Sequence, residues 1–168
     1  MPNLISQNLV KFIKNSLPGF SLFIFIFFTM VPLGLSPYKF STYIAIVPIF
    51  YWSIYRPDLF PIYFVFIAGL LYDFISGGPL GQWGLIFLLL RIGMESQRRI
   101  LIGKKFNVEW LAFTLVLLIV LFIVFLIGFL TYGTLVNFTE FIFQIIINIV
   151  FYPLIILVMN KIKIFISE

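Results

Sequence analysis

The stretch GLLYDFISGGPLGQWG, residues 69–84, places one aspartate inside a run of apolar residues and follows it closely with a turn sequence. Asp73 lies four residues before the turn Gly77-Gly78-Pro79. A glycine after a helix end accepts the left-handed conformation, and a proline suits the first turn of the next helix. The stretch therefore predicts a hairpin of two helices, with Asp73 within about one helical turn of its tip.

The composition is that of a membrane protein. The chain has 168 residues, of which 62% are hydrophobic and 10% charged, and its mean hydropathy is +1.17. Globular proteins use roughly 45–50% apolar and about 25% charged residues, so a soluble domain of this length could not bury so much apolar surface. Continuous apolar runs such as FIFIFFTMVPLGL, residues 23–35, argue against a β-barrel, whose strands would alternate. We predict an all-α polytopic membrane protein with a single domain.

Six apolar segments predict six transmembrane helices, because about 20 helical residues cross a ~30 Å hydrocarbon core. The second, third and fourth segments are short, and Pro48 predicts a kink or tilt in the second. Before the first span, residues 1–15 predict a short helix lying at the membrane surface. The predicted spans are residues 17–35, 42–55, 59–75, 80–96, 110–132 and 138–160.

The basic residues indicate the topology. Of the 11 Lys and Arg residues, Lys39 alone falls on one side of six alternating spans, Arg91 lies in the fourth, and the other nine share the opposite side. The positive-inside rule then puts both the N and the C terminus in the cytoplasm. All three tryptophans fall near predicted interfaces, as in an aromatic belt: Trp52, Trp83 and Trp110.

Asp73 is the first candidate site residue. An acid in a membrane segment is costly, by about 2.5–3.5 kcal/mol at a helix centre, and marks a functional position by default. Three roles stay open: capping of the fourth helix, whose first N–H groups need acceptors, contact with a partner, and handling of protons or ions. We favour capping, because proton relays usually need a second titratable group and we find none inside the first, second, third or fifth helix.

Two further charged groups lie toward the cytoplasmic side. Arg91 and Glu95 are four residues apart on the fourth helix, so they form either an ion pair inside the bundle or, as we favour, a solvated pair that reaches the interface. The predicted loop of residues 97–108 either binds a cytoplasmic partner or sets the topology and attracts anionic membrane lipids, at roughly 1 kcal/mol per residue. Its basic residues are Arg98, Arg99, Lys104 and Lys105.

A polar stripe follows one face of the sixth helix, where Glu140, Gln144 and Asn148 are spaced four residues apart. Gly69 and Asp73 form a comparable stripe on the third helix. The two stripes could face each other and line a pocket that opens outward, or each could hydrogen-bond to neighbouring helices. We favour the second interpretation.

The residues that are missing limit the chemistry. The sequence has no Cys and no His, which removes disulfides, thiol chemistry, His metal ligands and His general bases. We find no catalytic triad, metal motif or phosphate loop, so we expect no enzyme and no cofactor. The net charge of +5 comes from basic residues that flank apolar segments, so it predicts topology and not binding to nucleic acid.

The opening stretch resembles the signature of the rod shape-determining MreD family. Members carry a similar Gly-Leu-Leu-x-Asp, then a short Ser/Gly turn, then Pro-Leu-Gly at the start of the next helix. The sharp part covers about sixteen residues, and the chain length, the six spans and the basic loop extend a weaker resemblance over the whole chain. The matching residues here are Gly69, Leu70, Leu71, Asp73, Ser76, Gly77, Gly78, Pro79, Leu80 and Gly81.

The resemblance implies a non-catalytic, multi-pass component of the bacterial inner (cytoplasmic) membrane that supports rod shape and peptidoglycan synthesis. It implies an MreC-like bitopic membrane protein as partner, with MreB, RodA and a penicillin-binding transpeptidase in the same machinery. The implied fold is like the substrate-binding subunit of energy-coupling-factor transporters, so a solute-binding subunit of a vitamin-type transporter is the alternative. That alternative needs a small-residue docking face on the first helix, and the bulky residues 19–35 argue against it.

Overall fold

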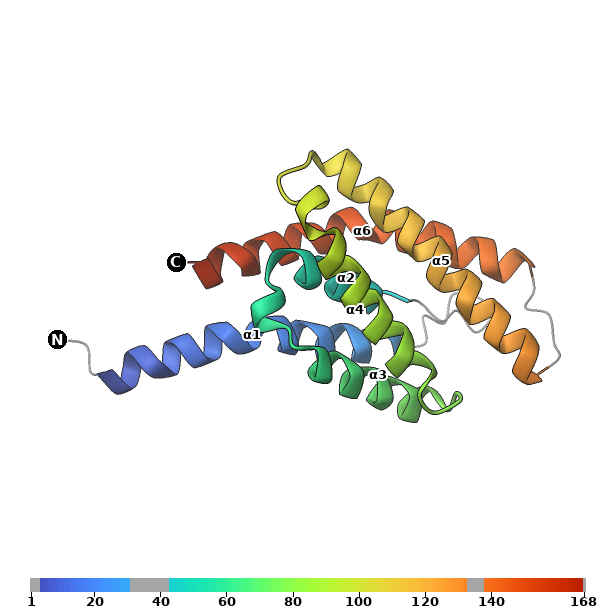
Figure 1. Cartoon of the computed structure of the whole chain (residues 1–168), viewed down its shortest axis with the longest axis horizontal. Helices are drawn as coiled ribbons and strands as arrows, with labels where there is room; N and C mark the ends of the chain where they lie inside the picture. The colour runs from blue at the N-terminus through green and yellow to red at the C-terminus, as the bar shows by residue number, and fades with distance from the viewer. Residues whose placement is uncertain (1–3, 31–42, 133–137, 168) are drawn as a thin grey trace.

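The structure is a computed structural model that describes residues 4–30, 43–132 and 138–167 (Figure 1). Regular structure within these residues is entirely helical, which confirms the predicted all-α fold class. The elements are α1 (Leu4–Met30), α2 (Ile46–Tyr55), the short 3₁₀ helix η1 (Pro57–Leu59), α3 (Ile62–Ser76), α4 (Gln82–Leu101), α5 (Phe106–Tyr132) and α6 (Phe138–Ser167).

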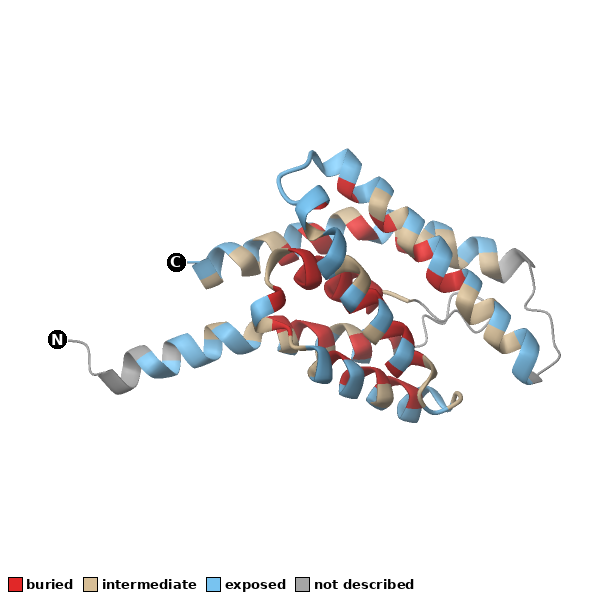
Figure 2. Cartoon of the chain, viewed as in Figure 1, coloured by how far each residue is buried: buried red, intermediate tan, exposed pale blue. Residues whose placement is uncertain are grey.

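Helix α2 forms the centre of the molecule. Every residue from Ile46 to Ile54 is buried, and α1, α4, α5 and α6 all contact this helix. Figure 2 shows the same pattern, with the buried residues gathered on α2 and on the helix faces turned toward it. A helix that is apolar on all sides needs such a surrounding. Helix α3 lies outside this centre and packs closely against α4, with which it forms a hairpin.

Within the described residues, three stretches are long and apolar enough to cross a membrane: Lys11–Thr29, Phe106–Thr131 and Phe141–Ser167. Helices α2 and α3 have 10 and 15 residues. At 1.5 Å per residue they measure about 15 and 22 Å, less than a ~30 Å hydrocarbon core. Helix α4 has 20 residues but includes two arginines in its last turn and the Arg91–Glu95 pair. By length and composition, the described helices therefore account for three of the six predicted spans.

The N-terminal part of the fold differs from the prediction. We expected a surface helix over residues 1–15 and a separate span from residue 17, but α1 is continuous from Leu4 to Met30. Pro18 lies inside α1 without ending it, although a proline removes one backbone hydrogen bond and its ring crowds the preceding turn. The hydroxyl of Ser21 donates to the Pro18 carbonyl at 2.7 Å. The end of the predicted first span and Lys39 lie outside the described residues.

Two further boundaries are corrected. Because α2 begins at Ile46, Pro48 lies in its first turn, where a missing N–H has no helical partner to lose, and the predicted kink is not needed. The predicted loop of residues 97–108 shrinks to residues 102–105, since α4 continues to Leu101 and α5 begins at Phe106. Arg98 and Arg99 are therefore in the last turn of α4, where cations suit the helix dipole.

The predicted aromatic belt is wrong for two of its three tryptophans. Trp52 is fully buried in α2, and its indole N–H donates to the Ser21 hydroxyl at 2.9 Å. Trp83 is also buried, at the start of α4. Only Trp110 is exposed. Large aromatic rings fill a core as readily as they anchor an interface, so sequence position alone did not distinguish the two.

The α3–α4 hairpin depends on a glycine contact between the two helices. A Cβ added at Gly69 would lie 2.5 Å from the Cα of Gly84 and 2.7 Å from the carbonyl oxygen of Trp83. No real carbon approaches backbone atoms so closely, so Gly69 is what allows the two helix backbones to touch. Close backbone contact at small residues is how helices associate in membranes, where the hydrophobic effect does not drive them together.

We expect Gly69→Ala to lower the free energy of unfolding by about 1–3 kcal/mol, because the added methyl group must push α4 away. Thermal unfolding of the purified protein in detergent measures this loss. The matched control is Gly128→Ala on α5, since a Cβ at Gly128 would meet nothing within 4 Å. A Gly69→Ala protein as stable as the Gly128→Ala protein would contradict the proposed backbone contact.

Candidate functional site

The predicted hairpin turn is present, with glycines at its two strained positions. Gly77 follows α3 with φ 69° and donates its N–H to the Asp73 carbonyl at 3.1 Å, and Gly81 precedes α4 with φ 93°. Both values lie in the left-handed region that favours glycine. The predicted start of the fourth helix is corrected: α4 begins at Gln82, and Pro79 stands before it, where its carbonyl accepts the Gln82 N–H at 3.2 Å.

Asp73 is fully buried and joins α3 to the start of α4. Its Oδ2 accepts the backbone N–H of Gly81 at 2.9 Å and of Gly84 at 3.3 Å, and its Oδ1 accepts the N–H of Trp83 at 2.9 Å. Free N–H groups at a helix start need such acceptors, and a negative charge there is favoured by the helix dipole. These are the hydrogen bonds that the capping interpretation expects.

Aromatic rings surround this end of the hairpin. The ring of Trp83 lies 5.0 Å from Tyr72 and 5.1 Å from Tyr43, and Tyr72 lies 5.9 Å from Phe87, measured between ring centroids. An apolar environment strengthens a satisfied hydrogen bond and makes an unsatisfied polar group more costly. The Asp73 carboxylate is therefore held where losing one of its partners would be expensive.

The other end of the hairpin is held by Arg91. The side chain is 2% exposed, its Nε donates to the Phe60 carbonyl at 2.8 Å, and its Nη2 donates to the Pro57 carbonyl at 2.9 Å. Its Nη1 pairs with Glu95 at 2.7 Å. Our prediction of a solvated pair is thus wrong for Arg91, which is buried and ties α4 to the segment before α3. It holds for Glu95, which is exposed.

A buried polar cluster joins α2, α5 and α6, and sequence reasoning missed its central acid. Glu109, in the first turn of α5, is 8% exposed and accepts a hydrogen bond from the Tyr55 hydroxyl. The Tyr51 hydroxyl donates to Asn160 Oδ1 at 2.6 Å, and the Lys163 ammonium lies 4.0 Å from the centre of the Tyr55 ring. Our expectation that the fifth helix holds no internal acid is wrong because α5 begins earlier than predicted.

The predicted polar stripes do not face each other. The stripe on α3 faces α4, through Gly69 against Gly84 and through the Asp73 hydrogen bonds. On α6, Asn148 is buried and donates to the Gln144 carbonyl at 2.8 Å, while its Oδ1 has no partner among the described atoms. The side chain of Glu140 lies outside the described residues. Among the described residues, Gly69 and Asp73 therefore contact α4, and Asn148 bonds within α6.

The part of the chain that the structure describes contains no group of three or more Asp, Glu, His or Cys side chains that could hold a metal ion. The hairpin residues of the predicted motif instead come together as one structural unit. Gly69 allows close packing, Asp73 caps α4, and Gly77 and Gly81 take left-handed conformations at the turn. What this arrangement does is hold two short helices in one fixed register.

The fold and the site define a helical membrane protein built around a capped hairpin. The model of the rod shape-determining protein MreD family matches residues 10–162 of the 168-residue chain. The protein belongs to this family, which confirms the resemblance of its hairpin sequence and implies a role in determining rod shape. No curated protein and no solved structure matches the chain.

We expect Asp73→Ala to destabilise the protein by about 1–3 kcal/mol, because the buried N–H groups of Gly81, Trp83 and Gly84 lose their acceptor. Asp73→Asn should lose less, because its amide oxygen can still accept two of these bonds. Thermal unfolding in detergent ranks the two variants. Equal destabilisation by both would show that the negative charge, and not its hydrogen bonds, holds the hairpin.

Proposed function

We propose that this protein is a non-catalytic scaffold of the cell-elongation machinery in the bacterial inner membrane, where it binds an MreC-like bitopic membrane protein and supports peptidoglycan synthesis. MreB, RodA and a penicillin-binding transpeptidase are the further partners expected in the same machinery. The observation that supports the proposal is the α3–α4 hairpin, whose signature residues hold a rigid frame and leave its outer face free for contact.

The outer face of the hairpin is large and apolar. Phe74 is 79% exposed near the end of α3, and Leu80 is 75% exposed in the turn. The same face of α3 includes the exposed side chains of Tyr63, Ile67 and Leu71. A transmembrane helix of a partner can pack on such a face by van der Waals contact, and the clamped ends of the hairpin avoid an ordering cost on binding.

The alternative of a solute-binding transporter subunit gains no support from the pocket between α4 and α5. A solute site needs several polar groups to orient an organic substrate. The residues that line this pocket are all apolar. The absence of Cys and His from the sequence likewise favours action through contacts over catalysis. The likeness to the energy-coupling-factor subunit remains a prediction.

The proposed topology has six spans with both termini in the cytoplasm. Contacts bring together the helix ends that this topology assigns to the cytoplasm: Lys14 of α1 lies 5.0 Å from the ring of Phe165 of α6, and Tyr55 of α2 bonds to Glu109 of α5. The topology assigns the same side to Arg98 and Arg99 at the end of α4 and to Lys104 and Lys105 in the connection to α5. In this topology the short helices α2 and α3 each span the membrane with the help of the segments that adjoin them.

Reporter fusions test this topology. A reporter that is active only outside the cytoplasm should be inactive when inserted at residues 102–105 and active when inserted at the turn of residues 77–80. Insertion after residue 167 should also give no activity. Activity at residues 102–105 would overturn the topology, whatever the result at the other positions.

Partner binding is tested by a matched pair of phenylalanine variants. We expect Phe74→Ala to reduce recovery of the MreC-like partner at least fivefold in mild detergent and to round the cells, because it removes the most exposed ring of the hairpin face. Phe122→Ala is the control, since Phe122 is 63% exposed on α5, a helix that is not part of the hairpin. Both proteins should reach the membrane at normal levels.

Two outcomes would contradict the proposed contact. Loss of the partner with Phe122→Ala and not with Phe74→Ala would indicate that the partner binds α5 instead. Full recovery of the partner with both variants would indicate that the hairpin face does not bind it. Turnover of a lipid-linked cell-wall precursor by the purified protein would contradict the non-catalytic role.

A further inference from the structure

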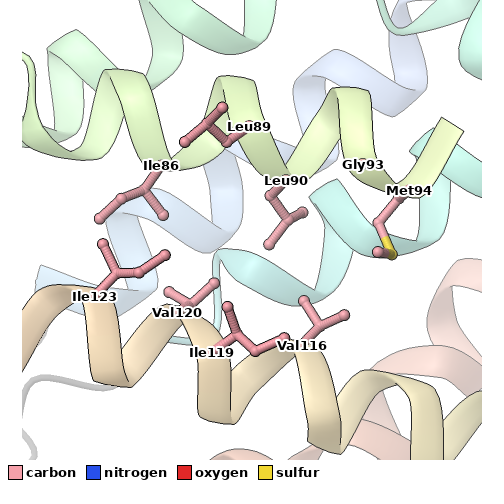
Figure 3. A pocket seen from close by; sticks show the side chains of 9 residues that line it. All are labelled: Ile86, Leu89, Leu90, Gly93, Met94, Val116, Ile119, Val120 and Ile123. Atoms are coloured by element: carbon pink, nitrogen blue, oxygen red, sulfur yellow. The ribbon is translucent and has the colours of Figure 1, made fainter. Parts of the chain in front are cut away.

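A groove of about 170 Å³ lies between α4 and α5, and apolar side chains alone line it (Figure 3). Its floor is buried, with Ile86 and Leu90 from α4 and Val120 from α5. Its rims, Leu89 and Ile119, are more than half exposed, so the groove opens at the outer surface of the bundle. Side chains from both helices point into the space between them (Figure 3).

Beyond the groove, the end of α4 and its connection to α5 carry positive charge. Arg98 and Arg99 end α4, and Lys104 and Lys105 lie in the short connection before α5. No ion pair within the described residues involves any of the four. The neighbouring acids are occupied, since Glu95 pairs with Arg91 and Glu109 accepts from Tyr55.

Arg98 adds a second observation at this end. Its Nε is buried and has no hydrogen-bond partner among the described atoms. A buried donor on a cation costs free energy until an acceptor reaches it. A phosphate group is a strong acceptor for an arginine and forms charge-assisted hydrogen bonds with it. The end of α4 and the connection that follows it thus combine four cations outside any ion pair of the described residues with an unsatisfied donor.

We propose that this groove binds one anionic phospholipid, with an acyl chain along α4 and α5 and the phosphate at Arg98 and the lysines of the connection. From Ile86 to Arg98, α4 rises about 18 Å at 1.5 Å per residue, a distance that suits an acyl chain hanging from its headgroup. The charge of the connection selects an anionic headgroup over a zwitterionic one, because basic residues at a membrane surface attract anionic lipids.

The composition of the walls argues against a helix as the occupant. Helices associate in membranes through small residues, and Gly93 is the one small residue on these walls. The remaining walls are branched aliphatic side chains and Met94, which suit a flexible hydrocarbon chain.

Native mass spectrometry of the full chain, purified in detergent and titrated with phosphatidylglycerol or phosphatidylcholine, tests the proposal. Gly93→Leu is designed to fill the groove, because Gly93 lies on its wall and a Cβ added there meets nothing within 4 Å. Its control is Gly128→Leu, which is equally open but lies outside the groove. Arg98→Gln with Lys104→Gln removes headgroup contacts, and the control with the same charge change is Lys11→Gln with Lys161→Gln.

We expect the wild type to hold one phosphatidylglycerol and to prefer it to phosphatidylcholine. The Arg98 and Lys104 pair should weaken phosphatidylglycerol roughly 25-fold, at about fivefold per charge, and leave phosphatidylcholine unchanged. Gly93→Leu should weaken both lipids at least tenfold. Neither control should change binding more than twofold. If Gly93→Leu fails to fold, the charge variants decide the question, since they alter only the helix end and the connection.

Other results would overturn the proposal. Equal loss of phosphatidylglycerol in the two charge pairs would mean that it binds by overall charge and not at this site. Unchanged phosphatidylglycerol binding by a folded Gly93→Leu protein would exclude the groove. If Gly93→Leu instead abolishes a dimer or releases a co-purified polypeptide while lipid stays bound, a protein segment occupies the groove.

Discussion

Helix α4 begins among apolar residues, so its first backbone N–H groups need acceptors that water does not supply, and the carboxylate of Asp73 meets this need. Because Asp73 belongs to α3, the same hydrogen bonds fix the register of α3 against α4. This register puts Gly69 opposite Gly84, where the backbones touch. At the far end, Arg91 bonds to carbonyl oxygens that precede α3, so both ends of the hairpin are fixed.

The remaining helices organise around the centre that this hairpin covers. Helix α2 is buried by α4 on one side and by α1, α5 and α6 on the others. Polar contacts lie at one end of α2, where Tyr55 hydrogen-bonds to Glu109 and its ring lies against the Lys163 ammonium. A protein built in this way has fixed, exposed apolar surfaces on α3 and α5, and few buried groups that could take part in a reaction. That combination suits a family whose role is rod-shape determination.

The sequence predicted the helices and the hairpin because the conformational preferences of glycine and proline, and the capping ability of a lone acid, are local and depend little on the surroundings. It did not predict which apolar faces are buried. Trp52 and Trp83 entered the core and not the interface, and Arg91 turned inward. In a membrane, lipid-facing and core-facing side chains are equally apolar, so periodicity cannot separate them. Glu109 was missed for a simpler reason, since its predicted place in a polar loop gave no sign of burial.

The partners of Arg91 bear on how the chain enters the membrane. An arginine in a membrane segment opposes insertion, most strongly at the centre, where the cost is about 2.5–3.5 kcal/mol, and the Nε and Nη2 groups of Arg91 donate to acceptors outside α4. The acceptors are the carbonyls of Pro57 and Phe60, which the ribosome makes some thirty residues earlier. When α4 emerges, its docking site has therefore already been synthesised, and we expect α3 and α4 to leave the translocon as a pair.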